Sequence, residues 1–350
     1  MKRFYLWFVI PLVLSLLTGF TTTASVSPSV SSSTGAAYTV LVGAERINQG
    51  AGLMAYFPGT LHVHVGDSVT WKANANEIHT VTFLAGAPAP HLEINAPPGA
   101  PSPVAFNPAV AFPAAPANGM YDGSTFVNSG LMSMEPGSPQ TFKLTFMKTG
   151  TFHYICLVHG VMMSGTIVVD AASVQNASPA QVSAQALAQI GFWFTKVPAA
   201  VAAANALVPP DTHNSDGSVT HHVLLGYNSG PLDLMRFFPS TVVAHPGDTI
   251  TWMLSPGNVA PHTVTFLNGT PDPSLIVPYN GALVVNPMIF FPANPGHPLT
   301  NSGYFNSGFF FPGSPATYSL KVGNFIGNLT FQCLLHDSSG MVGVVHVSLD

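Results

Sequence analysis

The sequence predicts an all-β protein built from two similar domains that a partly helical linker joins. Two observations carry this prediction: a series of motifs occurs twice in the same order, and short β-rich runs alternate with turn residues. Gly and Pro each occur 32 times and charged residues make up only 7% of the chain, which favours many short strands over long helices. Hydrophobic residues reach 47%, enough to bury a sizeable core.

The repeat organises most of the chain. The matched segments are 54–58 with 235–239, 64–71 with 245–252, 79–84 with 262–267, 126–130 with 304–308, 136–139 with 312–315, and 156–159 with 333–336. Because all of them keep the same order, we interpret the chain as a duplication. The predicted domains are residues 38–170 and 218–350.

Each repeat has the pattern of a β domain. Residues 79–84 alternate Thr with Val and Phe, which is the period of a half-buried strand. Further short runs at 60–65, 68–71, 142–146, 151–156 and 165–169 are separated by turn residues, as in a sandwich or barrel. The Pro- and Ala-rich stretch 88–118 is expected to be a long surface loop.

The segment between the repeats, residues 171–217, has a helical pattern. Ser178-Pro-Ala-Gln181 combines a capping serine, a proline at the first helical position and a glutamine at the third. The aromatic residues 192–194 favour a helix packed on a domain, because exposing all three would be unfavourable. The alternative is a loosely ordered spacer.

The N-terminus has the pattern of an export signal. Lys2 and Arg3 precede an apolar run, and a small-residue cleavage point follows Ala24. We expect a signal peptide at 1–24, a Ser/Thr-rich spacer at 25–37, and a periplasmic, cell-surface or extracellular protein. Contact with a membrane is expected only if the leader is retained as an anchor.

Composition argues against several function classes. The formal net charge is −5 and the sequence has no basic cluster, so nucleic acid is not an expected partner. Gly-x-Ser-x-Gly and His-Glu-x-x-His motifs of hydrolases are absent from the sequence. The two cysteines lie at matching positions of the repeats, which favours a separate, identical role for each over a disulfide.

Each repeat carries a set of metal-ligating side chains. In the second, Cys333, His336 and Met341 lie close together and His262 lies upstream. One thiolate, two imidazoles and a thioether suit copper, with Met as the weak axial ligand. The first repeat offers the equivalent set, with Met162 as an alternative to Met163: His79, Cys156, His159 and Met163.

The run Cys333-x-x-His336-x-x-x-x-Met341 resembles the type 1 copper site of plastocyanin and related cupredoxins, and the first repeat resembles it with a shorter loop. The resemblance implies Greek-key β-sandwiches, two copper ions per chain and one-electron transfer to redox partner proteins of the cell envelope. It also implies that His159 and His336 reach toward an apolar surface patch, where electrons would leave. The family often has Asn directly after the first histidine, whereas this chain has Thr80 and Thr263 there. The resemblance therefore does not predict the hydrogen bonds around the sulfur.

Three other functions fit parts of the pattern. Zinc also binds Cys and His, although Met is a poor zinc ligand. A two-domain copper oxidase or nitrite reductase would need further histidine ligands, for which His62 and His64 are the candidates. Such enzymes also commonly have a histidine directly before the type 1 cysteine, where this chain has Ile155 and Gln332. Copper storage or delivery would need Met- or His-rich tracts. We therefore expect an electron carrier and not an enzyme.

Overall fold

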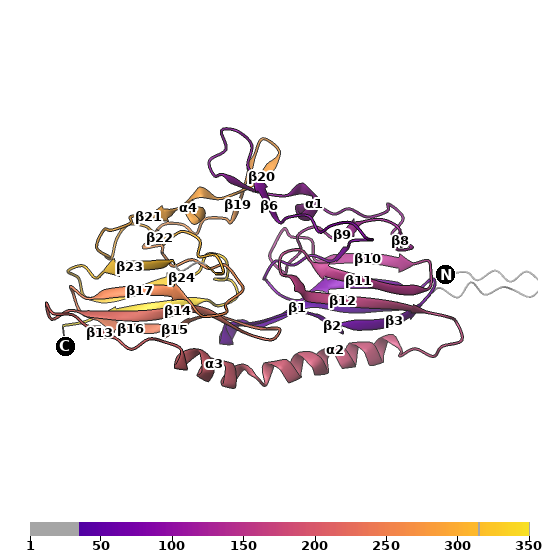
Figure 1. Ribbon diagram of the computed structural model, residues 1–350, viewed down its shortest axis with the longest axis horizontal. Coiled ribbons are helices and arrows are strands. Elements are labelled where there is room, and N and C mark those ends of the chain that lie inside the picture. Colours follow the sequence, from indigo (N-terminus) through magenta and orange to yellow (C-terminus); the bar gives the residue numbers. More distant parts are fainter. Residues whose placement is uncertain (1–34, 314–315, 350) are drawn as a thin grey trace, which may run out of the picture. The chain divides into compact units, whose positions relative to one another are not determined.

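The computed structural model describes residues 35–313 and 316–349, which belong to one compact unit, Thr34–Asp350. The predicted signal peptide and most of the predicted spacer lie outside the described residues. The described chain is mostly β, as predicted, with two longer helices between its halves (Figure 1). The helices are α1 (Pro108–Ala111), α2 (Pro179–Phe194), α3 (Val197–Ala206) and α4 (Pro287–Phe290), with a short 3-10 turn, η1 (Ile47–Gln49).

The largest sheet of the described chain has ten strands and runs through both halves. Its order is β23 (Thr317–Lys321), β17 (Thr249–Leu254), β14 (Val219–Ser229), β15 (Leu232–Phe238), β2 (Ala51–Phe57), β1 (Ala37–Arg46), β4 (Ser68–Ala73), β10 (Thr141–Phe146) and β8 (Met120–Tyr121), with β13 (Thr212–His213) beside β14. The halves join where β15 pairs antiparallel with β2, through Leu232–Leu53, Asp233–Gly52 and Leu234–Ala51. Backbone hydrogen bonds therefore connect the two repeats.

A second sheet covers the large one in each half. In the first half its order is β3 (Thr60–His64), β12 (Gly160–Asp170), β11 (Gly150–Cys156), β5 (Thr82–Phe83) and β9 (Val127–Asn128). In the second half its order is β16 (Thr241–Ala244), β25 (Val342–Val347), β24 (Gly327–Gln332), β18 (Thr265–Phe266), β22 (Phe305–Ser307) and β21 (Pro292–Ala293). Each half is thus a two-sheet sandwich whose core contains one fully buried tryptophan, Trp71 or Trp252.

The helical linker lies along the other face of the ten-stranded sheet (Figure 1). Helix α2 contacts β1 and β2, and α3 contacts β14 and β15, so the pair crosses the junction of the halves. Phe194 is buried between helices and sheet, whereas Phe192 is exposed, so the aromatic trio packs only in part. Among the described residues, the stretch Pro179–Ala206 is also long and apolar enough to cross a membrane by length and composition.

The start of α2 has the predicted capping box. The Gln181 amide donates to Ser178 Oγ at 3.4 Å, and the Ser178 amide donates to Gln181 Oε1 at 2.8 Å. Ser178→Ala should lower the free energy of unfolding by about 1 kcal/mol, because the Gln181 amide loses the hydroxyl that accepts its hydrogen bond. Chemical denaturation measures this, with Ser183→Ala on the same helix as a control that should change it by only a few tenths.

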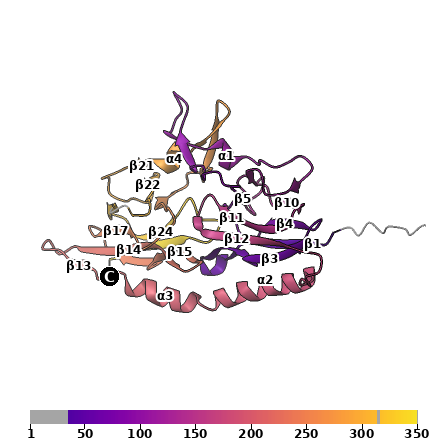
Figure 2. The same cartoon turned by 45° about the vertical axis from the view of Figure 1, so that its right-hand side comes forward.

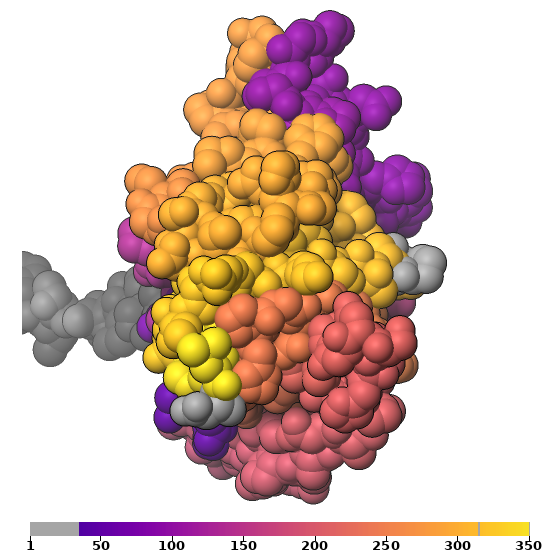
Figure 3. Space-filling model, turned by 90° about the vertical axis from the view of Figure 1, so that its left-hand side faces the viewer, coloured from indigo at the N-terminus to yellow at the C-terminus, as the bar shows by residue number. Residues whose placement is uncertain are grey.

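Residues 88–118 do not form the predicted irregular loop. They contain a hairpin of β6 (Glu93–Asn95) and β7 (Val104–Phe106), followed by α1. This hairpin joins β20 (Ala282–Val285) and β19 (Ile276–Tyr279) of the second half in a four-stranded sheet, in which Ala105 pairs with Val284 and both are buried. The sequence of one repeat alone does not indicate this burial of Ala105 against the other half. The two hairpins lie side by side (Figures 1, 2 and 3).

One repeated motif has the same structural role in both halves. The Asn128 side chain donates to the carbonyls of Ala109, Val110 and Phe112 around α1. Asn306 likewise donates to the carbonyls of Met288, Ile289 and Phe291 around α4. Each amide oxygen accepts a hydrogen bond from the strand that follows the upstream histidine, so the repeated Asn-Ser-Gly sequence positions that strand.

Candidate metal sites

The first group of donors comes from three separate segments of the first half. His79 lies just before β5, Cys156 ends β11, and His159 lies in the turn between β11 and β12. His79 Nδ1 and His159 Nδ1 are 3.2 Å apart, and Cys156 Sγ is 3.4 Å from His159 Nδ1. Two imidazole nitrogens and one sulfur therefore converge on one point.

The second group repeats this arrangement. His262 precedes β18, Cys333 follows β24, and His336 lies in the loop before β25. The two Nδ1 atoms are 3.1 Å apart, and Cys333 Sγ lies 3.7 Å from that of His262 and 3.5 Å from that of His336. Both cysteines are free and buried, each within its own group.

The spacing of the donors suits a bound ion. All donor atoms of each group lie within 4.8 Å of one another. Cys and His donors bind a first-row ion such as zinc at about 2.0–2.3 Å, so three of them around one ion lie about 3.3–4 Å apart. The residues present therefore fit a trigonal ion without a large rearrangement.

A methionine is buried in the same core as each cysteine. Met163 on β12 belongs to the core that contains Cys156, and Met341 to the core that contains Cys333. The Cys333 amide donates to the carbonyl of Met341 at 3.1 Å, which ties the two ends of that loop together. Met162 is 57% exposed.

The threonine after each upstream histidine supports the cysteine through its backbone amide. The amides of Thr80 and Thr263 donate to Cys156 Sγ and Cys333 Sγ, both at 3.3 Å. The Thr80 hydroxyl accepts from the amide of Leu157 at 2.7 Å, and the Thr263 hydroxyl from that of Leu334 at 2.8 Å. Each threonine thereby fixes both the sulfur and the residue after it, a role that the sequence left open.

The outer nitrogens of the upstream histidines pack against glycines. A Cβ on Gly43 would lie 2.6 Å from His79 Nε2, and one on Gly226 would lie 2.3 Å from His262 Nε2. Both glycines have positive φ, +68° and +64°. His262 Nε2 also lies 3.1 Å from the Asn258 amide nitrogen, which together with the packing fixes the ring so that Nδ1 faces the cysteine.

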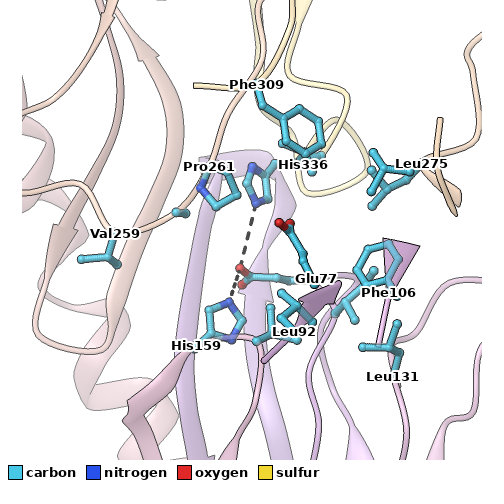
Figure 4. Close-up of a pocket in the computed structure, with 16 residues that line it drawn as sticks. Glu77, Leu92, Phe106, Leu131, His159, Val259, Pro261, Leu275, Phe309 and His336 are labelled. Carbon is cyan, nitrogen blue, oxygen red and sulfur yellow. Dashed lines mark hydrogen bonds and ion pairs between the residues drawn. The ribbon is translucent and has the colours of Figure 1, made fainter. Parts of the chain in front are cut away.

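The outer nitrogens of the two Cys-loop histidines, His159 and His336, point to one residue that the sequence did not reveal. Glu77 Oε1 lies 3.0 Å from His159 Nε2 and 4.0 Å from His336 Nε2, as the dashed lines in Figure 4 show. These three residues line an otherwise largely apolar cavity of about 130 Å³ between the halves, together with Phe106, Val158, Pro261, Leu275, Phe309 and others. The expectation that both histidines reach an external surface patch is wrong, because each faces the other half of the chain.

Comparison with known proteins identifies one half of this arrangement. Residues 43–170 match the plastocyanin/azurin family of copper binding proteins. This segment contains His79, Cys156, His159 and Met163. No curated protein matches the chain.

Solved structures that are similar to part of this chain include amicyanins and a plastocyanin. An oxidized amicyanin mutant is 25% identical, over 38% of this chain and 82% of that one, with a TM-score of 0.23. A Cu(I) form of another amicyanin mutant is 26% identical, over 39% and 83%, at 0.23. A mutant plastocyanin of fern is 18% identical, over 37% and 100%, at 0.21. Because these scores are low, the case for copper binding rests on the family match and on the donor geometry.

The two His-Cys-His groups differ in their electrostatics. Burial raises the pKa of the Cys156 thiol, but the charge and hydrogen bond of His159 outweigh it and hold that pKa well below its usual range. Burial raises the pKa of the Cys333 thiol to about 11. The thiolate of the first group is therefore already stabilised before any ion arrives, by the imidazole that Glu77 contacts.

The other candidate histidines lie elsewhere. His62 and His64 are on β3, where His62 Nδ1 lies 2.8 Å from Asp170 and His64 Nε2 lies 2.9 Å from the carbonyl of Val174. Within the described residues, the two His-Cys-His groups are the places where three or more such donors come together.

Proposed function

We propose that this protein is an exported electron carrier with one type 1 copper site in each half. The observation that carries the proposal is the occurrence of two groups, each with two Nδ1 atoms and one sulfur, beside a buried methionine in the same core. The proposed ligands are His79, Cys156, His159 and Met163 in the first half, and His262, Cys333, His336 and Met341 in the second. Bound copper would supply the one-electron Cu(I)/Cu(II) couple.

The chain's own residues would hold the donors in place in both oxidation states. Thr80 and Thr263 donate to the sulfurs, Asn258 and the glycines fix the upstream rings, and the sandwich cores exclude water. A ligand set that is fixed in advance needs little rearrangement when its charge changes. The exposed position of Met162 supports Met163 as the axial ligand.

Buried donors also favour a carrier over a copper store. Cys156, Cys333 and His262 are completely buried and His336 is 5% exposed, whereas delivery to another protein needs ligands that can exchange. We further propose that the redox partners are proteins of the cell envelope, because the N-terminal pattern predicts export.

Copper titration of the purified mature protein tests this function. We expect an intense thiolate-to-copper absorption band that saturates at about two ions per chain, from the count of donor sets. Cys156→Ala and Cys333→Ala should each remove one ion and roughly half of the band, because each deletes the sulfur of one site. Metal content and visible absorption measure both effects.

Other outcomes would contradict the proposal. A colourless protein that prefers zinc would indicate structural metal sites. Uptake of more than two coppers together with oxidase or nitrite reductase activity would favour the enzymatic alternative, and rapid loss of copper to a chelator would favour storage or delivery.

A further inference from the structure

The Cys loop of the second half is docked on the first half. The Asn76 side chain donates to the carbonyl of Ser338 at 3.1 Å, and the Ser339 hydroxyl donates to Glu45 Oε1 at 2.9 Å. A Cβ on Gly340 would lie only 2.3 Å from the carbonyl oxygen of Ile47. The loop that carries His336 is therefore held by side chains and backbone of the other half.

Glu77 lies at the centre of this contact. Its side chain is 7% exposed and lies between the outer nitrogens of His159 and His336 (Figure 4). Its amide donates to Glu45 Oε1 at 2.9 Å, the same oxygen that accepts from Ser339. The backbone of Glu77 and the second Cys loop thus bind the same oxygen of Glu45, which fixes the distance between the Glu77 carboxylate and both histidines.

The second half supplies no equivalent carboxylate. In the first half, Glu77 lies in the loop between Trp71 and His79. The matching loop between Trp252 and His262 contains Asn258 and no acidic residue. Among the described residues, Glu77 is therefore the carboxylate within 4.0 Å of both Cys-loop histidines, and it belongs to the first half.

We propose that Glu77 is a positioning residue for the first metal site, and that its charge sets the reduction potential of the second-half site from across the interface. This inference rests on the proposed function. The carboxylate is within hydrogen-bond distance of His159, and such a partner at the outer nitrogen of a metal-binding imidazole orients the ring and makes it a stronger ligand. At His336, 4.0 Å away, it acts through its charge. In this buried setting its negative charge also stabilises the more positive oxidation state of each ion, which lowers the potential.

Proteins with a single metal site separate the effect of Glu77 on the first site from its effect on the second. Cys156→Ala retains only the second site and Cys333→Ala only the first. Glu77→Gln added to Cys333→Ala should weaken copper binding about tenfold, the lower end of the usual loss when such a hydrogen-bonded outer partner is removed. The same change is added to Cys156→Ala, in which Glu77 acts on the remaining site through its charge. Glu77→Gln should also raise the potential and shift the thiolate-to-copper band in both proteins. Glu77→Asp should restore part of the change.

The control is Glu93→Gln in the same two proteins, since Glu93 lines the same cavity and should leave affinity, potential and band unchanged. If Glu77→Gln changes only the first site, and affinity and potential at the second stay the same, Glu77 serves its own half and the inference is wrong. If both sites lose copper but circular dichroism and thermal unfolding show a disrupted fold, with no rescue by Glu77→Asp, the role is structural and the inference is also wrong. Absence of the band from both single-site proteins before Glu77 is changed would instead overturn the proposed function.

Discussion

Gly226→Ala is expected to abolish copper binding by the second half while the first half keeps its ion. The added Cβ would lie 2.0 Å from the Asn258 amide nitrogen and 2.3 Å from His262 Nε2, distances that real contacts do not reach. Both partners are buried, so neither can simply turn into solvent. The steric overlap can be removed only if the His262 ring moves, and this movement separates His262 Nδ1 from Cys333. Copper content should fall from two ions toward one, and visible absorption by about half.

The same substitution should also destabilise the fold. A left-handed backbone costs a non-glycine residue about 1–2 kcal/mol, and steric overlap with a buried histidine adds to this. We expect a total loss of more than about 3 kcal/mol in the free energy of unfolding, measured by denaturant on the metal-free protein.

Two glycines provide matched comparisons. Gly217 has a φ of +87° and open space around its Cβ position, so Gly217→Ala should show the backbone cost alone and keep both coppers. Gly43→Ala should mirror Gly226→Ala at the first site, because its Cβ would overlap His79 Nε2. Full copper retention in Gly226→Ala would show that the His262 ring is not fixed by this packing.

The sequence predicted the parts of the candidate site that are encoded locally. Cys156 and His159, or Cys333 and His336, lie in one short loop, and the duplication showed which upstream histidine belongs to each. The capping box of Ser178 and Gln181 was equally local, and the structure confirms it. In each case a short spacing fixes the geometry without any knowledge of the rest of the fold.

Contacts between the halves could not be predicted in this way. Glu77 has no motif of its own, and its role depends on His336, which is far away in sequence. The hairpin β6–β7 has no clear strand pattern in the sequence, because β7 finds its partner β20 on the other half. The predicted direction of His159 was wrong for the same reason: the pattern of one repeat does not show that the other half covers that face.

Asp233→Asn is expected to make the protein more stable at alkaline pH. Asp233 lies on β15, at the junction with β2, and is fully buried. Among the described residues neither of its carboxyl oxygens has a hydrogen-bond partner. Burial, and then the charge of Glu77, raise the pKa of Asp233 to about 8.

The sign of the pH dependence follows from this shift. The usual pKa of an aspartate, 3.8, is lower than that of Asp233 in the folded chain. The contribution of the Asp233 carboxyl to the free energy of unfolding is therefore fully present below about pH 4 and is lost as the pH rises to about 8. The asparagine variant lacks this titration, so its free energy of unfolding should exceed that of the unmodified protein at pH 8–9, by an amount on the order of a few kcal/mol.

Denaturant unfolding of the metal-free protein between pH 4 and pH 9 measures the difference. Asp216→Asn is the control: Asp216 is exposed, and hydrogen bonds from Ser218 lower its pKa, so this change should not stabilise the protein at high pH. Equal pH profiles for Asp233→Asn and the unmodified protein would mean that the Asp233 carboxyl ionises normally. A carboxyl that stays neutral next to Glu77 has a direct consequence for the interface, because it adds no second negative charge beside the carboxylate that contacts the two Cys-loop histidines.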